Sequence, residues 1–258
     1  MPTLGVVPYL NAVPLLDGLP PDVLQRPGDP SLLSRWLAEG TVDAALLPVA
    51  EALRGVGDGP LGRFGIAGEG PVDSVLAFLP RPGPPESWPR RVVLDPASRT
   101  SVALLRVVLE RRYGLRPEYT VAADLGPDPR AHPDAIVLAI GDRAMARRRE
   151  CPTAPVLDLG AEWTAWTGLP FVFARWTARK GLPAPERAAL ADLLDRAAER
   201  GLARRDALAD AHGPAHGLAP EEARRYLRTS IRFVLGAREE AGLARFAEEL
   251  SRLEGALR

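Results

Sequence analysis

The residues most able to do chemistry follow short apolar runs that are typical of buried strands. Ligands of open α/β folds bind beyond the carboxyl ends of such strands. The strand ends predicted here are 8–11, 48–51, 95–101 and 141–142. A serine, Ser74, stands at the start of a further apolar run that extends to Leu79. We therefore expect the candidate functional residues at these five places.

Asn11 follows the first predicted strand and is the only asparagine in the chain. Its carboxamide offers two donors and an acceptor, but it cannot act as an acid or a base. The alternative role for Asn11 is to cap the helix that runs through Leu15 and Leu16. Tyr9, considered by itself, is typical of a packing residue.

The turn at residues 96–101 joins a predicted strand to a predicted helix and carries the hydroxyls of Ser98, Thr100 and Ser101. Backbone N–H groups at a helix start, together with such hydroxyls, hold a carboxylate or a phosphate. Because the glycine-rich phosphate motifs are absent, nothing specifies phosphate. The alternatives are simple capping, by Ser98 here and by Asp142 at the helix that begins near Gly141.

Metal and triad chemistry find little support in the sequence. His212 and His216 have the spacing of paired helical ligands, but Gly213 and Pro214 between them break the helix that this spacing needs. The single cysteine, Cys151, permits no disulfide within the chain and no zinc site by itself. We therefore expect no metal site.

The elements around these residues predict two α/β lobes. Strands and helices alternate, pause at the proline-rich segment 81–89, and restart at Arg91; from about Pro185 the pattern is almost entirely helical. We place a crossing between lobes at this segment. The first expected lobe combines residues 1–88 with residues 177–258, because the C-terminal helices are expected to pack back on it. The second expected lobe is 89–176, and a cleft lies between the two.

Composition excludes several classes of function. The 258 residues are 46% apolar and 26% charged, as in an ordinary globular protein. The 33 basic and 33 acidic residues balance, which argues against a broad nucleic-acid or anionic-membrane surface. No stretch approaches a membrane span, and the first residues lack the features of a signal peptide. A cytoplasmic protein with a small-molecule ligand is expected.

Taken together, the motifs resemble the chorismate dehydratase family of the futalosine route to menaquinone. The resemblance runs nearly the whole length of the chain, in order. It is carried by segments 9–15, 40–51, 72–75, 98–101, 140–142, 158–163, 167–171, 226–227, 242–243 and by Phe246. The chain departs from the family at Pro48-Val49, where many members are expected to have a serine. It lacks the Cys-Pro-Asn-Asp type of start found in the sister dihydroxynaphthoate synthase.

The resemblance implies a type II periplasmic-binding-protein-like fold used as an enzyme, without metal or organic cofactor. It implies dehydration of chorismate to 3-[(1-carboxyvinyl)oxy]benzoate. On this basis Asn11 and Ser74 are the candidate catalytic residues, and Tyr9, Ser98, Thr100, Ser101, Gly141 and Asp142 are candidates for substrate binding. The competing functions are a solute-binding protein for small anions, which is normally exported, and the sister synthase.

Neither the motifs nor the resemblance identifies the base that removes the ring proton. Asn11 cannot accept a proton, and no histidine follows a strand that forms the cleft. We hypothesise that the enolpyruvyl carboxylate of the substrate removes the proton, with Asn11 and Ser74 fixing its approach. Asp142 is the alternative base.

Overall fold

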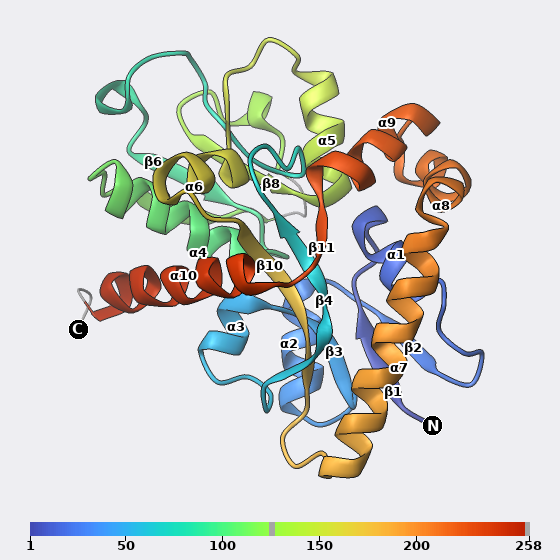
Figure 1. The fold of residues 1–258 in the computed structure, drawn as a ribbon. Helices are drawn as coiled ribbons and strands as arrows, with labels where there is room; N and C mark the ends of the chain where they lie inside the picture. The colour runs from blue at the N-terminus through green and yellow to red at the C-terminus, as the bar shows by residue number, and fades with distance from the viewer. Residues whose placement is uncertain (124–126, 256–258) are drawn as a thin grey trace.

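The computed structural model describes residues 1–123 and 127–255 and is built on two mixed sheets (Figure 1). The first has the order β11-β4-β10-β3-β1-β2 and the second β7-β6-β8-β5-β9. The strands of the first sheet are β1 (Thr3–Val6), β2 (Leu24–Pro27), β3 (Ala44–Pro48), β4 (Pro60–Gly68), β10 (Phe171–Ala178) and β11 (Arg232–Val234). Those of the second are β5 (Val75–Phe78), β6 (Arg91–Leu94), β7 (Glu118–Val121), β8 (Ile136–Ile140) and β9 (Val156–Asp158).

Helices cover both sheets, which confirms the predicted α/β class. In the first lobe they are α1 (Val13–Leu16), α2 (Pro30–Ala38), α3 (Val49–Leu53), α7 (Ala184–Ala203), α8 (Arg205–His212), α9 (Pro220–Arg225) and α10 (Ala237–Gly255). In the second they are α4 (Thr100–Val107), α5 (Gly141–Glu150) and α6 (Leu159–Thr167). The short 3-10 helices are η1 (Leu10–Ala12), η2 (Pro85–Ser87), η4 (Pro129–Ala131) and η5 (Gly213–His216); η3 (Val108–Arg112) and η6 (Tyr226–Ser230) are single π-helical turns.

Local sequence explains the clearest elements. α2 has Asp29 at its N-cap position and Pro30 at its first helical position, and Gly40 just beyond its end is left-handed at φ 70°. Proline at the start and a left-handed glycine past the end match the asymmetry of helix termini. β3 and β8 are buried along their whole length, as their unbroken apolar runs predict for central strands.

The sheets divide the chain at other points than the sequence suggested. Residues 75–78 form β5 of the second sheet, although they were expected in the first lobe, and β10 from Phe171 belongs to the first sheet. The proline-rich segment 81–89 is a loop between β5 and β6, within the second lobe. Prolines end regular structure, but they carry no information about which sheet the next strand joins. The chain therefore crosses between sheets at 69–74 and 168–170, not at 88/89 and 176/177.

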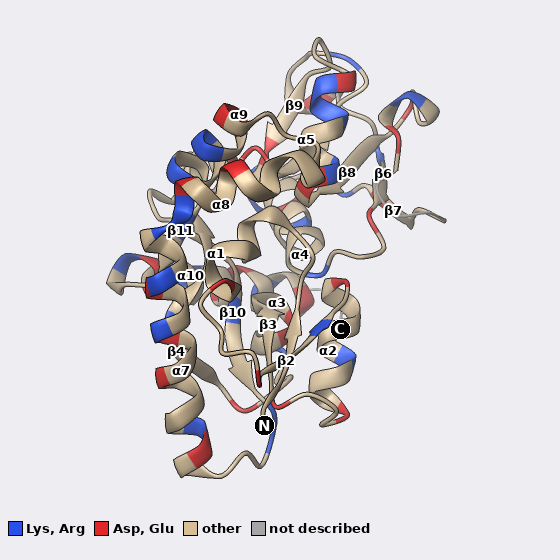
Figure 2. Cartoon of the chain, turned by 90° about the vertical axis from the view of Figure 1, so that its right-hand side faces the viewer, with Lys and Arg blue, Asp and Glu red and all other residues tan. Residues whose placement is uncertain are grey.

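The C-terminal helices pack back on the first sheet, as expected. α7 contacts β4 and α1, whereas α10 lies along β10 and also reaches α4 of the second lobe. Both α7 and α9 carry basic as well as acidic segments, in keeping with the balanced net charge (Figure 2). Among the described residues, no helix combines the length and apolar character needed to cross a membrane.

Candidate active site

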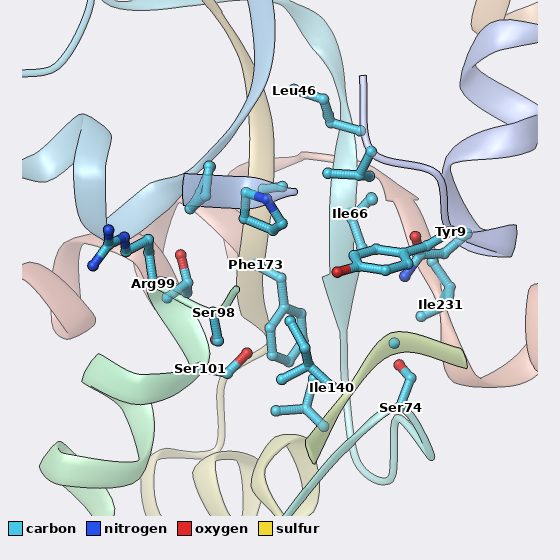
Figure 3. A pocket seen from close by; sticks show the side chains of 18 residues that line it. Tyr9, Leu46, Ile66, Ser74, Ser98, Arg99, Ser101, Ile140, Phe173 and Ile231 are labelled. Carbon is cyan, nitrogen blue, oxygen red and sulfur yellow. The ribbon is translucent and has the colours of Figure 1, made fainter. Parts of the chain in front are cut away.

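A cavity lies where the two lobes meet, and its empty space of about 600 Å³ includes the solvent at its open side. It is lined by Val7, Tyr9, Asn11, Pro30, Leu46, Pro48, Ile66, Ser74, Val75, Ser98, Arg99, Thr100, Ser101, Ile140, Gly141, Phe173, Ala174 and Ile231 (Figure 3). Most of these side chains are apolar, and the polar ones are few. Such a lining suits a ligand with a hydrocarbon frame and a small number of polar groups.

Strand topology explains why these distant residues meet. β1 and β3 are parallel in the first sheet, and β6 and β8 are parallel in the second, so their carboxyl ends form two opposed edges. β5 runs antiparallel to β8, which brings its beginning, with Ser74, to the same edge. The structure thus brings together seven of the eight predicted residues: Tyr9, Asn11, Ser74, Ser98, Thr100, Ser101 and Gly141.

The alternative interpretation expected Asn11 to cap a helix, but Ala12 occupies the N-cap position of α1. Asn11 lies inside η1, and its Nδ2 donates to the hydroxyl of Tyr226 over 3.0 Å. The Tyr226 hydroxyl in turn donates to Ser74 Oγ over 2.9 Å. The Asn11 Oδ1 atom is buried and has no hydrogen-bond partner within the described structure. An unpaired buried carbonyl is costly, so this atom is available to a ligand that brings a donor.

Ser74 is held by an unusual turn. The residue before it, Asp73, is the single non-glycine residue with positive φ, at 59°, in the described backbone. The half-buried Asp158 carboxylate accepts hydrogen bonds from the backbone N–H groups of Val72 and Asp73, at 2.9 and 2.8 Å. These bonds compensate for the left-handed conformation, which is unfavourable for residues other than glycine. Burial raises the pKa of Asp158, while the N–H donors oppose that rise.

The hydroxyl-rich turn has the geometry that its sequence predicts. Asp95, buried at the end of β6, accepts from Ala97 N at 3.0 Å, and α4 begins at Thr100. The Thr100 hydroxyl accepts from Ala50 N of the first lobe at 3.2 Å. Ser98 does not cap the helix: Arg99 occupies the N-cap position, and its side chain makes no capping bond. The serine hydroxyls therefore remain at the cavity wall.

Tyr9 forms the wall that faces this turn (Figure 3). Its ring lies 3.1 Å from the point that a Cβ atom on Gly141 would occupy, and Gly141 itself has φ 62°. The Tyr9 hydroxyl is buried and has no hydrogen-bond partner in the part of the chain that is described. Burial raises the pKa of this phenol, although the nearby Arg143 guanidinium acts in the opposite direction. Tyr9 therefore presents a neutral hydroxyl to the cavity.

Asp142 does not line the cavity in this structure, and its expected part in substrate binding stays a prediction. Its carboxylate accepts from Leu10 N at 3.4 Å and lies 2.7 Å from His216 Nδ1. Burial raises the pKa of the Asp142 carboxyl, and the His216 ring lowers it in part. α8 ends at His212 and His216 lies in η5, so the two histidines do not share one helix; within the described ranges no three His, Cys, Asp or Glu residues cluster to hold a metal ion.

Sequence reasoning missed two polar residues of this region. Arg99 lines the cavity and is exposed, and its guanidinium lies on the side away from Tyr9 (Figure 3). Tyr226 was noted as part of a motif, but its contact with Asn11 and Ser74 joins positions 215 and 152 residues apart. No local pattern carries such a contact. Arg99, in contrast, could have been found from its place between Ser98 and Thr100.

Solved structures define the class to which this fold belongs. A protein of Archaeoglobus fulgidus superposes with a TM-score of 0.76 at 15% identity, covering 99% of this chain and 98% of that one. The periplasmic aliphatic sulphonate binding protein SsuA of Escherichia coli superposes with a TM-score of 0.65 at 17% identity, covering 99% and 87%. At these identities the likeness shows the fold. The chain has the two-lobed, periplasmic-binding-protein-like architecture expected from the sequence.

Sequence comparison is more specific. A family model described as "Menaquinone biosynthesis" matches residues 2–252. A relative named chorismate dehydratase, from Thermus thermophilus, is 34% identical over 268 residues, which cover 96% of this chain and 94% of that protein. The chain belongs to the menaquinone biosynthesis family, and the resemblance drawn from its motifs is confirmed.

Proposed function

We propose that this protein is a lyase that dehydrates chorismate to 3-[(1-carboxyvinyl)oxy]benzoate in menaquinone biosynthesis. The observation that carries the proposal is the 34% identity, over almost the whole of both chains, to a protein named chorismate dehydratase. The cavity supports it independently, because its apolar walls and separated polar groups match a carbocycle that bears two carboxylates and a hydroxyl. The cytoplasmic location expected from the sequence stays a prediction.

The start of α4 is the proposed cradle for one carboxylate. Its unpaired backbone N–H groups and the hydroxyls of Ser98 and Ser101 are donors at the cavity wall, and the helix dipole favours negative charge there. Arg99 adds a positive charge at the same end of the cavity, where it would favour entry of a dianion. Pro48 supplies no hydroxyl at the facing turn, but the next residues contribute Ala50 N, which fixes Thr100.

Asn11 and Ser74 are the proposed orienting pair. Ser74 accepts a hydrogen bond from Tyr226, so its own proton can be donated into the cavity, and Asn11 Oδ1 is a free acceptor beside it. The Ser74 donor can bind the leaving oxygen of the substrate or its enolpyruvyl carboxylate, whereas Asn11 Oδ1 can accept the proton of the leaving hydroxyl and so orient it. Either contact would assist the reaction by orientation and by stabilising charge on the leaving oxygen.

The cavity offers no obvious protein base. Among the described lining residues there is no carboxylate and no imidazole. We therefore assign proton removal to the enolpyruvyl carboxylate of the substrate. This carboxylate removes the proton from the ring carbon that is vinylogous to the ring carboxylate. The electrons of that C–H bond form the new ring double bond as the C–O bond to the neighbouring hydroxyl breaks. The proton then passes to the departing hydroxide, and one water leaves an aromatic ring.

Asp142→Asn tests the alternative base. Because this carboxylate is bound to Leu10 N and His216 and does not line the cavity, the variant is expected to retain turnover within about tenfold. A loss of several orders of magnitude in kcat with chorismate binding intact would instead make Asp142 the base and overturn the substrate-assisted step.

The deciding experiment is incubation of the purified protein with chorismate, followed by mass spectrometry and ultraviolet spectroscopy. We expect catalytic loss of one water and the appearance of an aromatic spectrum. If chorismate survives stoichiometric protein, the proposed reaction is wrong. In that event a rise in Tm with chorismate would identify a small-anion binding protein, whereas no rise would mean that the ligand is a different molecule.

A further inference from the structure

Tyr226 lies behind the cavity and joins the two candidate catalytic residues. It is only 1% exposed, and it is not among the residues that line the cavity. Its hydroxyl accepts from Asn11 Nδ2 at 3.0 Å and donates to Ser74 Oγ at 2.9 Å. We propose that Tyr226 is a positioning residue, which sets the direction of the hydrogen bonds that Asn11 and Ser74 offer to the substrate. This inference rests on the proposed function for its kinetic consequences.

Counting protons gives the direction of the bonds. A carboxamide nitrogen only donates, and a phenol has one proton. Because Asn11 Nδ2 donates to the phenol oxygen, the Tyr226 proton is directed to Ser74, and the Ser74 proton is left for the cavity. Asn11 Oδ1 is left as the acceptor. If the phenol were absent, the amide could turn over and the serine hydroxyl could rotate, and the paired donor and acceptor would no longer be defined.

Burial keeps Tyr226 in this role. Removal from water raises the pKa of the phenol, and the carboxylates of Asp142 and Asp73 raise it further, whereas the bonds to Ser74 and Asn11 act in the opposite direction. The hydroxyl therefore keeps its proton throughout the range in which the reaction would be measured. Tyr226 acts as a fixed dipole and not as a general acid.

The same segment of the chain also holds the turn before Ser74. Ser230 Oγ donates to Asp73 Oδ2 at 2.8 Å, and an Arg225 nitrogen lies 3.3 Å from the same oxygen. Asn11 follows β1 of the first sheet, whereas Ser74 precedes β5 of the second. Residues 225–230 thus contact groups from both lobes. Within this segment, Tyr226 is the residue that bonds directly to Asn11 and Ser74.

Tyr226→Phe removes only the hydroxyl. We expect kcat for chorismate to fall roughly 10- to 100-fold, the effect of losing a buried hydrogen bond that orders reacting groups, with KM changed by less than about threefold. Tyr119→Phe is the matched control: its hydroxyl donates to Glu110 in the second lobe, outside the cavity lining. It should retain wild-type kcat. A Tyr226→Phe enzyme with wild-type kcat would overturn the proposal.

A double-mutant comparison separates positioning from general support of the fold. If Tyr226 acts through Ser74, then Tyr226→Phe should reduce kcat much less on a Ser74→Ala background than on the wild type. A reduction by the same factor on both backgrounds would contradict a role through Ser74. Thermal unfolding of each variant, measured in parallel, shows whether the protein remains folded at the assay temperature.

The single asparagine permits a test that does not depend on any reaction. Selective labelling with ¹⁵N-asparagine gives a single side-chain carboxamide nitrogen, that of Asn11, with separate signals for its two protons. We expect slowed exchange for one of its protons in the wild type and faster exchange, with a changed shift, in Tyr226→Phe but not in Tyr119→Phe. An unchanged signal in Tyr226→Phe would refute the contact even if the protein does not convert chorismate. A changed signal with no chorismate turnover would instead refute the proposed function and leave the contact established.

Discussion

Replacing Gly141 with alanine should disturb the candidate site through the ring of Tyr9. Gly141 has φ 62°, and an added Cβ would lie 3.1 Å from two ring carbons of Tyr9. The left-handed conformation costs a residue with a Cβ atom about 1–2 kcal/mol. For a chain of this size, that corresponds to a fall in Tm of roughly 2–8 °C.

The collision adds a functional effect. The ring must move by a few tenths of an ångström, because 3.1 Å is closer than ordinary van der Waals contact. Since a misplacement of about 1 Å can reduce turnover ~100-fold, we expect roughly a 3- to 10-fold loss of kcat/KM for chorismate.

Gly168→Ala is the matched control. Gly168 has φ 70°, and its added Cβ would meet none of the described atoms within 4 Å. Both variants should lose similar stability in thermal unfolding, and only Gly141→Ala should lose activity in the chorismate assay. Equal activities would refute the role given to the Tyr9 ring. A fall in Tm below about 1 °C for both variants would refute the argument from backbone conformation.

Two further predictions concern partly or fully buried ionisable groups. Burial raises the pKa of all four tyrosines, and that of Tyr113 to about 12. Unfolded tyrosine ionises near about pH 10, so between that pH and the raised pKa values the folded state binds more protons than the unfolded state. The free energy of unfolding should therefore fall as the pH rises through this range, and phenolate absorbance at 295 nm should appear together with unfolding. Phenolate in the folded protein near pH 10 would contradict this. Asp158→Asn replaces a carboxylate oxygen that accepts hydrogen bonds from backbone N–H groups with an NH2 donor, and should lower the free energy of unfolding in urea by about 2–4 kcal/mol. Asp134→Asn, at an exposed position, is the control and should change it by less than about 0.5 kcal/mol. Equal effects of the two substitutions would show that the turn before Ser74 does not depend on Asp158.

The sequence predicted the strand ends well because apolar runs mark buried strands and topology gathers their ends. Tyr9, Asn11, Thr100 and Gly141 meet in one cavity for that reason. The sequence did not predict where the chain changes sheet: the crossing at 69–74 has few prolines, and the proline-rich loop at 81–89 stays within one lobe.

The missed features share a physical cause, which is that they depend on contacts between distant segments. The Asp142–His216 pair joins α5 to η5 across 74 residues, so a helix-capping interpretation was the natural one for Asp142. Strand β11 has only three residues, and it pairs with β4 after an interval of more than 160 residues. Short strands of this kind are defined by their partner and not by their own sequence.

The bond from Ala50 N to Thr100 has a consequence for the timing of turnover. It joins the first lobe to the helix start proposed as the carboxylate cradle, and the Asn11–Tyr226–Ser74 chain crosses between the lobes as well. A motion that separated Ala50 from Thr100 and Tyr226 from Ser74 would break both links, so a protein opened in this way would lack the aligned groups that the proposed reaction needs. If substrate and product exchange in that opened form, reaction and exchange belong to different conformations, and the rate of opening then sets an upper limit on the number of turnovers per second.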